Sequence, residues 1–218
     1  MLYVVATPIG NLEDITDRAR RILTSVSYIA CEDPNHSRIL LQKIGSVAKT
    51  IALNAHSKSP KVDQVISLLL AGNDVAYITD AGTPGISDPG GILVEAAHNK
   101  EIEVCPIPGP SAVACALSVC GFCADQFIFY GYIPKKKGRQ TFWLKLQNQK
   151  ITAVMFESPD RIAKTLAEIR ATIKPDRRVC ICRELTKQFE QIWRGTIAQI
   201  ESAKIMAKGE FVIVLEGD

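Results

Sequence analysis

The chain has 218 residues, of which 47% are hydrophobic and 22% charged, as in an ordinary soluble globular protein. No apolar run approaches the roughly 18 residues that a membrane-spanning helix needs, and Met1 leads almost directly into an apolar segment without a signal peptide. We therefore expect a cytoplasmic protein whose seven cysteines are reduced thiols rather than disulfides.

The net charge of +3 is divided unevenly along the chain. Residues 1–114 carry 9 Lys and Arg against 12 Asp and Glu, whereas residues 115–218 carry 17 against 11. No acidic residue lies between Asp125 and Glu157, a stretch that holds Lys135, Lys136, Lys137, Arg139, Lys145 and Lys150. Such a block predicts an anionic partner, most commonly a nucleic acid, although a solvated helix face with a basic loop has the same composition.

The first half of the chain alternates short apolar strands with amphipathic helices. Strands are predicted over Leu2–Ala6, Tyr28–Cys31, Thr50–Leu53, Val75–Thr79 and Val104–Ile107. A short helix is predicted over Ile92–His98, and the other helices are predicted to begin at the capping residues Asp14, Ser37, Ser59 and Ser111. Since strands that alternate with helices form parallel sheets, we expect a five-stranded parallel sheet.

The second half has a less regular pattern. Strands are predicted over Phe127–Tyr130, Thr152–Glu157, Arg178–Arg183, Gln191–Gly195 and Glu210–Glu216. Helices are predicted over Arg139–Gln147, from Ser158 to about Ile173, and after a capping box at Thr196–Gln199. The third and fourth strands are close in sequence and are expected to pair antiparallel, which makes this sheet mixed. The predicted fold class is therefore α/β, with two domains over residues 1–114 and 115–218.

The most unusual loop follows the fourth strand of the first half. Asp80–Gly91 contains four glycines and two prolines in twelve residues, and glycine lets a ligand approach the main chain closely. The loop has no Lys or Arg but carries the carboxylates of Asp80 and Asp88, whereas a phosphate-binding loop normally adds a lysine. It is suited to a positively charged ligand such as a sulfonium cofactor, or it is a long surface turn.

Two further loops of the first half also follow strands, Thr7–Asn11 and Pro108–Ala112. Because the carboxyl ends of parallel strands share one edge of a sheet, these loops and Asp80–Gly91 are expected to line one ligand cleft. Phe156–Pro159 and Arg183–Lys187 follow strands of the second half and are expected to join it.

Together these segments resemble the tetrapyrrole methylase family. The matching motifs occur in family order over nearly the whole chain, at Leu2–Thr16, Cys31–Asp33, Asp80–Gly91, Pro106–Ala112, Gly131–Pro134, Phe156–Pro159, Arg183–Lys187 and Lys208–Phe211. Within the family, the chain is most similar to members that methylate a ribose 2′-hydroxyl of small-subunit ribosomal RNA.

The resemblance implies two α/β domains that bind S-adenosylmethionine in the cleft between them, in a homodimer without a metal. The cofactor contacts that it implies are Pro8, Asp80, Ala81, Gly82, Ile86, Ser111, Ala112, Phe156 and Leu185. The implied substrate is a cytidine ribose in the decoding region of the 30S subunit. The candidate substrate-binding residues are Asp33, His36, Lys135, Arg161 and Arg183.

Methyl transfer from a sulfonium is an in-line displacement, in which the enzyme chiefly positions the reacting atoms. A ribose hydroxyl also gains from a general base, for which Glu184, Lys187, Asp33 and His36 are the candidates. We favour Glu184, with Lys187 or Arg183 orienting phosphate. Lys187 would need a depressed pKa to act as a base itself.

Some residues depart from the family pattern. Pro34 and Asn35 replace the usual Thr-Arg after the Cys31–Asp33 motif, and Asp160 replaces a histidine. Family members usually continue for several dozen residues beyond the position of Asp218.

Two alternatives stay open, namely the same fold acting on a tetrapyrrole or protein side chain, and an inactive module that binds ribosomal RNA. The spacing of Cys120 and Cys123 matches a redox pair, but a predicted helix precedes it, which argues against a redox role.

Overall fold

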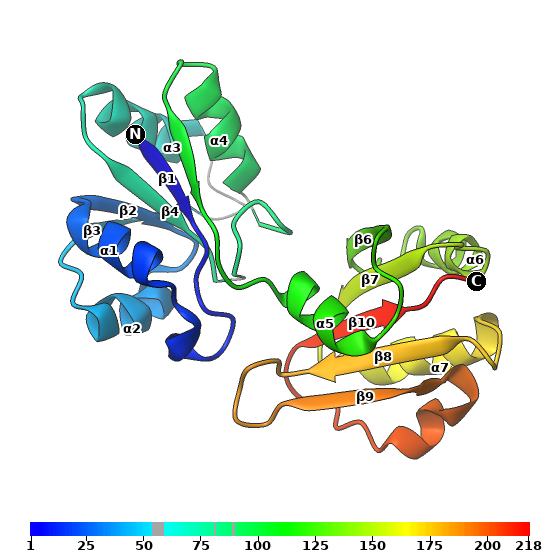
Figure 1. Ribbon diagram of the computed structural model, residues 1–218. Helices are drawn as coiled ribbons and strands as arrows, with labels where there is room; N and C mark the ends of the chain where they lie inside the picture. The colour runs from blue at the N-terminus through cyan, green and yellow to red at the C-terminus, as the bar shows by residue number, and fades with distance from the viewer. Residues whose placement is uncertain (54–58, 81, 89) are drawn as a thin grey trace. The chain divides into compact units, whose positions relative to one another are not determined.

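The computed structural model of the protein describes residues 1–53, 59–80, 82–88 and 90–218 (Figure 1). The chain forms two compact units, Met1–Ser111 and Ala112–Asp218, each with its own five-stranded sheet. Within the described ranges, no helix has the length and apolar character needed to cross a membrane.

The sheet of the first unit is entirely parallel, as predicted, with the strand order β3-β2-β4-β1-β5. Its strands are β1 (Leu2–Val5), β2 (Tyr28–Cys31), β3 (Lys49–Ala52), β4 (Val75–Ile78) and β5 (Val104–Ile107). The central strand β4 is buried along its whole length, which explains why its sequence is apolar throughout.

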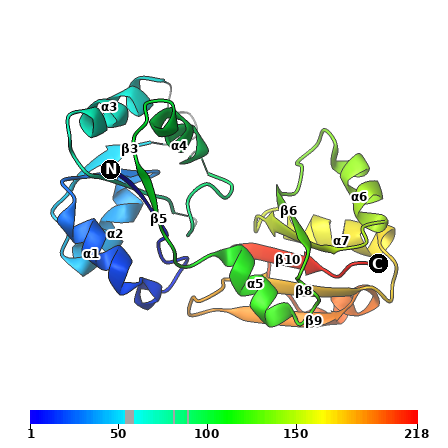
Figure 2. The ribbon, with the colours of Figure 1, turned by 45° about the horizontal axis from the view of Figure 1, so that its top comes forward.

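Helices cover both faces of this sheet (Figures 1 and 2). They are α1 (Asp17–Ser25), α2 (Pro34–Ile44), α3 (Ser59–Leu70) and α4 (Gly90–His98), with a short 3₁₀ helix, η1 (Leu12–Asp14), before α1. Ala76 and Ile78 of β4 face the core formed with α1 and α2, whereas Val75 and Tyr77 face the core formed with α3 and α4.

Two helix starts differ from those predicted. The side chain of Thr16, not Asp14, caps α1, because Asp14 belongs to the 3₁₀ helix that Asn11 caps. Asp33, not Ser37, caps α2: its carboxylate accepts the amide of Asn35, and Pro34 occupies the first helical position. A proline at that position favours the earlier start because its fixed φ suits the first turn of a helix.

The strand order creates a switch point between β1 and β4. These strands are neighbours, yet the chain leaves β1 toward α1 on one face and leaves β4 toward α4 on the other. In open α/β sheets, ligands bind at the carboxyl ends of strands at such a switch point.

The second unit has the mixed sheet that was predicted, with the strand order β6-β7-β10-β8-β9. Its strands are β6 (Phe127–Tyr132), β7 (Thr152–Glu157), β8 (Arg178–Arg183), β9 (Gln191–Thr196) and β10 (Phe211–Leu215), and its helices are α5 (Ala112–Cys120), α6 (Arg139–Gln147), α7 (Ile162–Thr172) and the 3₁₀ helix η2 (Ile197–Ala203). β6 and β7 are parallel and the other pairs antiparallel, including the predicted β8–β9 pair.

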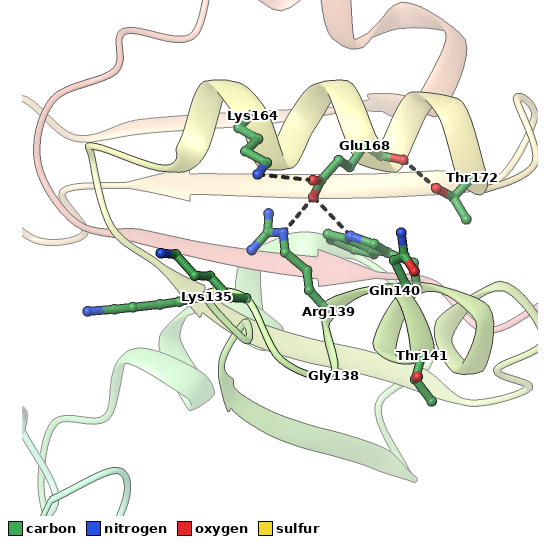
Figure 3. Close-up of a pocket in the computed structure, with 10 residues that line it drawn as sticks. Lys135, Gly138, Arg139, Gln140, Thr141, Lys164, Glu168 and Thr172 are labelled. Carbon is green, nitrogen blue, oxygen red and sulfur yellow. Dashed lines mark hydrogen bonds and ion pairs between the residues drawn. The ribbon is translucent and has the colours of Figure 1, made fainter.

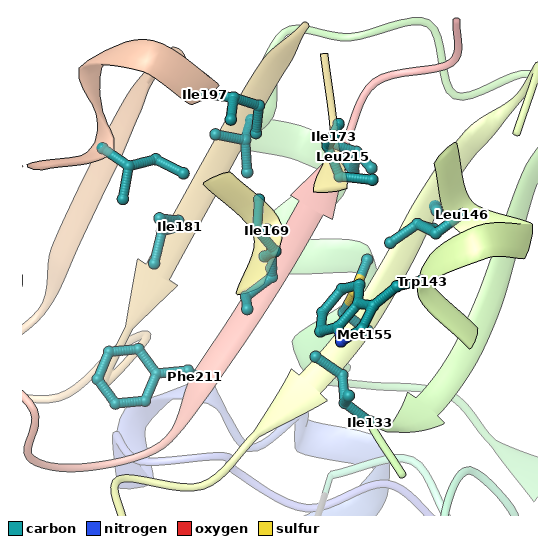
Figure 4. Packing of buried hydrophobic residues seen from close by; sticks show 14 of the residues in the cluster. Ile133, Trp143, Leu146, Met155, Ile169, Ile173, Ile181, Ile197, Phe211 and Leu215 are labelled. Atoms are coloured by element: carbon teal, nitrogen blue, oxygen red, sulfur yellow. The ribbon is translucent and has the colours of Figure 1, made fainter. Parts of the chain in front are cut away.

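The core of this unit lies between its sheet and the helices α6, α7 and η2 (Figure 4). Trp143 and Leu146 of α6 and Ile169 of α7 pack against Met155 and Ile213 of the sheet. Packing of this kind makes α6 and α7 neighbours, although their sequences are separated by a strand.

The helix α7 begins later than its predicted start at Ser158. The carbonyl of Ser158 accepts the amides of Arg161 and Ile162, so a turn precedes the first helical residue. The predicted capping box at Thr196 and Gln199 is confirmed at the start of η2.

Candidate cofactor and substrate site

The three strand-end loops of the first unit are joined by hydrogen bonds. The backbone amide of Thr7 donates to the carbonyl of Gly82 at 3.1 Å, and the Thr83 hydroxyl donates to the carbonyl of Pro110 at 2.9 Å. The buried hydroxyl of Thr7 donates to the carbonyl of Thr79 at 2.7 Å. The predicted gathering of these loops at one edge of the sheet is therefore confirmed.

Gly82 is the closest point of contact among the loops. Its φ of +90° lies in the left-handed region that favours glycine. A Cβ atom at this position would lie 2.7 Å from Cγ2 of Ile9 and 2.9 Å from the carbonyl oxygen of Pro110. Only glycine lets the loop after β4 pass between the other two loops.

Asp88 organises the loop that follows β4, a role that sequence reasoning missed. Its carboxylate accepts the backbone amides of Gly85 at 2.8 Å, Ile86 at 3.1 Å and Gly90 at 2.7 Å, and the hydroxyl of Tyr77 at 3.3 Å. An aspartate that bonds amides near its own position in a glycine-rich turn is the available sequence signal. The negative charge of Asp88 is thus largely compensated by hydrogen bonds that its carboxylate accepts within the loop and from Tyr77.

Asp80 is the carboxylate of this loop that lies beside other acidic groups. Burial raises the pKa of Asp80; the neighbouring His36 opposes this, and Glu32 and Asp33 add to it. Glu32 in turn accepts the hydroxyl of Thr79 at 3.1 Å. The ends of β2 and β4 therefore present negative charge, which suits a cationic ligand.

The other candidate cofactor residues are distributed over both units. Pro8, Ile86 and Ser111 are partly buried in the three loops of the first unit, and Ala81 lies outside the described residues. In the second unit Ala112 begins α5. Phe156 lies in β7, one residue before its end, beside the rings of Phe129 and Tyr132, and Leu185 is buried.

The Arg183–Lys187 loop is held by a network of charged groups. The ammonium of Lys187 donates to Glu184 at 2.9 Å and to Glu210 at 2.8 Å, and the Glu210 amide donates to the Glu184 carboxylate at 2.9 Å. Glu184 and Thr186 both have positive φ, at 51° and 66°. Two strained residues in one short turn mark a loop whose shape is imposed by its contacts.

The pKa values of this pair do not favour a general base. Burial alone would raise the pKa of Glu184, but the Glu210 amide and the Lys187 ammonium outweigh it and lower that pKa. Burial alone would lower the pKa of Lys187, but Glu210 and Glu184 outweigh it and raise that pKa. The shift at Lys187 is the reverse of the one that a lysine base requires.

Two candidate substrate-binding cations are engaged inside the protein instead. The buried guanidinium of Arg183 donates to the carbonyls of Lys208 at 2.5 Å and Phe189 at 2.9 Å. Arg161 pairs with the buried Glu157 at 2.5 Å and donates to the carbonyl of Ile133. Both guanidinium groups therefore bond groups of the protein itself, and a contact of these two arginines with substrate stays a prediction.

The remaining substrate candidates differ in their surroundings. Asp33 is exposed and its carboxylate caps α2; His36 and Lys135 are also exposed. Among the described residues, no group of three or more His, Cys, Asp or Glu side chains is arranged to hold a metal ion.

Comparison with known proteins adds the family context. The sequence model of the tetrapyrrole (corrin/porphyrin) methylases matches residues 1–201. The ribosomal RNA small subunit methyltransferase I of Xylella fastidiosa is 41% identical, over 99% of this chain and 81% of that protein. The protein of the same name from Thermotoga maritima is 40% identical, over 99% of this chain and 98% of that protein.

Solved structures share the fold at much lower identity. A cobalt precorrin-4 methyltransferase superimposes with a TM-score of 0.73 at 19% identity and covers 99% of this chain and 94% of its own. The methyltransferase CobJ gives a TM-score of 0.73 at 16% identity, over 99% and 93% of the two chains.

Proposed function

The chain belongs to the tetrapyrrole methylase family, and on that premise we propose that it methylates the 2′-hydroxyl of a cytidine ribose in small-subunit ribosomal RNA. The methyl donor is S-adenosylmethionine, which supplies an electrophilic methyl group on a sulfonium. The proposal also includes a homodimer in the cytoplasm, and light scattering of the purified chain tests the dimer.

The observation that carries the proposal is the bonded set of three loops at the switch point between β1 and β4. Thr7, Gly82 and Pro110 fix the loops against one another, and the absence of a side chain at Gly82 lets the loops pack this closely. Asp80–Gly91 contains no Lys or Arg, so the loop is matched to a sulfonium rather than to a phosphate. In this proposal Pro8, Asp80, Gly82, Ile86 and Ser111 hold the cofactor in the first unit. Ala112, Phe156 and Leu185 are the candidates in the second unit.

The negative charge of Asp80 provides a test with two matched ligands. Asp80→Asn is expected to weaken S-adenosylmethionine binding by roughly five-fold, about 1 kcal/mol, as for one partly solvated charge. S-adenosylhomocysteine, whose sulfur is neutral, should lose much less affinity. Isothermal titration calorimetry measures both. An equal loss for the two ligands would show that Asp80 shapes the loop without acting through its charge.

Asp80 should also make the affinity for S-adenosylmethionine depend on pH. Because the pKa of Asp80 is raised, its carboxylate takes up a proton at a higher pH than an ordinary aspartate does. S-adenosylmethionine affinity of the wild type should therefore fall as the pH is lowered through that raised pKa, and Asp80→Asn should not show this fall. Parallel pH profiles for the two proteins would contradict the assignment.

Glu184 and Lys187 remain our candidates for the groups closest to the reacting hydroxyl. Since the pKa of Glu184 is lowered by its partners, we propose that it orients Lys187 and the loop and is a poor proton acceptor. Glu184→Gln should then reduce kcat by about ten-fold, leave S-adenosylmethionine affinity unchanged, and keep the shape of the pH–rate profile. A general base would instead give a loss of about 10²–10⁴-fold with a missing acid limb. Unchanged turnover would remove Glu184 from the site.

The function itself is tested by methyl transfer from tritiated S-adenosylmethionine. The acceptors are unmethylated 30S subunits, naked small-subunit ribosomal RNA, and a tetrapyrrole mixture. We expect label in RNA, recovered after digestion as 2′-O-methylcytidine. Label in the tetrapyrrole or in protein would replace the proposed substrate, and cofactor binding without transfer to any acceptor would favour an inactive binding module.

A further inference from the structure

The second unit contains a hollow between the start of α6 and one side of α7 (Figure 3). Its volume is about 530 Å³, within the range of sites that hold a ligand of nucleotide size. The lining side chains that matter for its chemistry are polar or charged: Lys135, Lys136, Arg139, Gln140, Lys164 and Glu168. We call this hollow the α6–α7 pocket.

Cations outnumber carboxylates in the α6–α7 pocket. Glu168 is the one acidic residue in its described lining, and it is already engaged. Its carboxylate accepts Nε of Arg139 at 2.7 Å and the indole Nε1–H of Trp143 at 2.9 Å. Figure 3 shows Arg139 and Lys164 converging on this carboxylate. The charge of Glu168 is thus balanced by the buried Arg139, which leaves the lysines in excess.

The lysines of the α6–α7 pocket are available to a ligand. Lys135 and Lys136 are exposed, and no carboxylate of the described residues lies within ion-pair distance of either. Lys164 is exposed and reaches Glu168 only at 3.8 Å. Arg139 is fixed below them, because it also donates to the carbonyl of Pro134 and to Thr165. Exposed ammonium groups beside a hydrogen-bonded guanidinium suit a phosphate group, because charge-assisted hydrogen bonds to phosphate oxygens are strong.

Trp143, which also lines the pocket, is not placed to stack on the bases of a nucleic acid. Trp143 is 5% exposed and its N–H is bonded to Glu168, so its ring offers no stacking surface. The exposed polar side chains of Gln140 and Thr141 add groups that bond phosphate or ribose oxygens. The pocket therefore offers groups that bind the sugar–phosphate backbone of a nucleic acid rather than its bases.

We propose that the α6–α7 pocket binds the phosphodiester backbone of the RNA substrate. This inference rests on the proposed function, since it names where that substrate is held. Lys135, Lys136 and Lys164 contact phosphate oxygens there without regard to base sequence. The segment between Asp125 and Glu157, which lacks acidic residues, supplies two of these three lysines.

The test compares two double variants that remove the same charge. Lys136→Gln/Lys164→Gln changes the pocket, and Lys137→Gln/Lys150→Gln changes exposed lysines outside its lining. Binding of unmethylated 30S subunits and of naked small-subunit ribosomal RNA is measured over a range of salt concentrations. The pocket variant should bind on the order of ten-fold more weakly at about 0.1 M salt. The slope of log affinity against log salt should fall by about 1.5, because each lost phosphate contact removes about 0.7–0.9.

Methyl-transfer assays on the same proteins separate this inference from the proposed function. If the wild type binds and methylates RNA while the pocket variant keeps its affinity and salt slope, the inference fails and the function stands. Equal losses in both double variants would show a diffuse basic surface and would also overturn it. A wild type that neither binds nor methylates RNA would overturn the proposed function and the pocket assignment together. Unchanged S-adenosylmethionine affinity and thermal unfolding confirm that each variant is folded.

Discussion

Gly82→Ala is expected to reduce S-adenosylmethionine affinity on the order of 100-fold and to destabilise the first unit. A left-handed φ costs an L-residue about 1–2 kcal/mol, and overpacking adds about 1–3 kcal/mol. Both act here, since the new Cβ would meet Ile9 and the Pro110 carbonyl at less than van der Waals distance. Relief of the overlap requires the three loops to separate, which removes the proposed cofactor site. Calorimetry with S-adenosylmethionine measures the loss.

Gly85→Ala is the matched control for this substitution. Gly85 lies in the same loop with a φ of +88°, but no described atom lies within 4 Å of the position its Cβ would take. It therefore carries the backbone strain without the collision. We expect a loss of stability of about 1–2 kcal/mol with cofactor affinity reduced less than ten-fold. If the two variants bind the cofactor equally well, close packing of the loops is not what forms the site.

Glu157→Gln should destabilise the second unit by about 3–5 kcal/mol, as when one partner of a buried ion pair is removed. The Glu157 side chain has no exposed surface, pairs with Arg161 at 2.5 Å, and lies 3.8 Å from Arg139. It also accepts the Thr165 hydroxyl at 2.6 Å. Loss of its charge leaves two largely buried guanidinium groups less compensated. Chemical denaturation monitored by tryptophan fluorescence measures the change, because both Trp143 and Trp193 lie in this unit.

Glu201→Gln removes the same charge from a pair at the surface. Glu201 accepts from Arg170 at 2.7 Å, but its side chain is 75% exposed. Exposed pairs of this kind contribute about 0–1 kcal/mol, so this variant should unfold close to the wild type. Similar midpoints for Glu157→Gln and Glu201→Gln would contradict the structural role assigned to Glu157.

The gathering of the three strand-end loops of the first unit was predictable because it follows from sheet geometry. Once Val75–Ile78 and Leu2–Val5 are recognised as parallel strands, their following loops must share an edge. The fine contacts were not predictable. The sequence shows only that Asp88 places a carboxylate in the loop. The structure shows that this carboxylate accepts hydrogen bonds from three backbone amides.

The arginines show which feature of the candidate substrate site a sequence does not reveal. Arg161 follows β7 and Arg183 is the last residue of β8, and near strand ends a contact with substrate is a reasonable expectation. A long side chain can instead turn back to bond carbonyls or a buried carboxylate, as both do here, and its direction is set by packing that a single sequence does not reveal. The α6–α7 pocket was hidden for a related reason. Arg139 and Glu168 are far apart in the sequence and meet only because α6 and α7 pack on the same face of the sheet.

Amide hydrogen exchange with and without S-adenosylmethionine tests the central claim most directly, since it locates the ligand on the chain. Our account predicts that the cofactor slows exchange in Thr7–Asn11, Asp80–Gly91 and the segment around Ser111, and that ATP at the same concentration does not. Protection confined to other segments, or equal protection by ATP, would contradict the assignment of these loops to a methyl-bearing sulfonium.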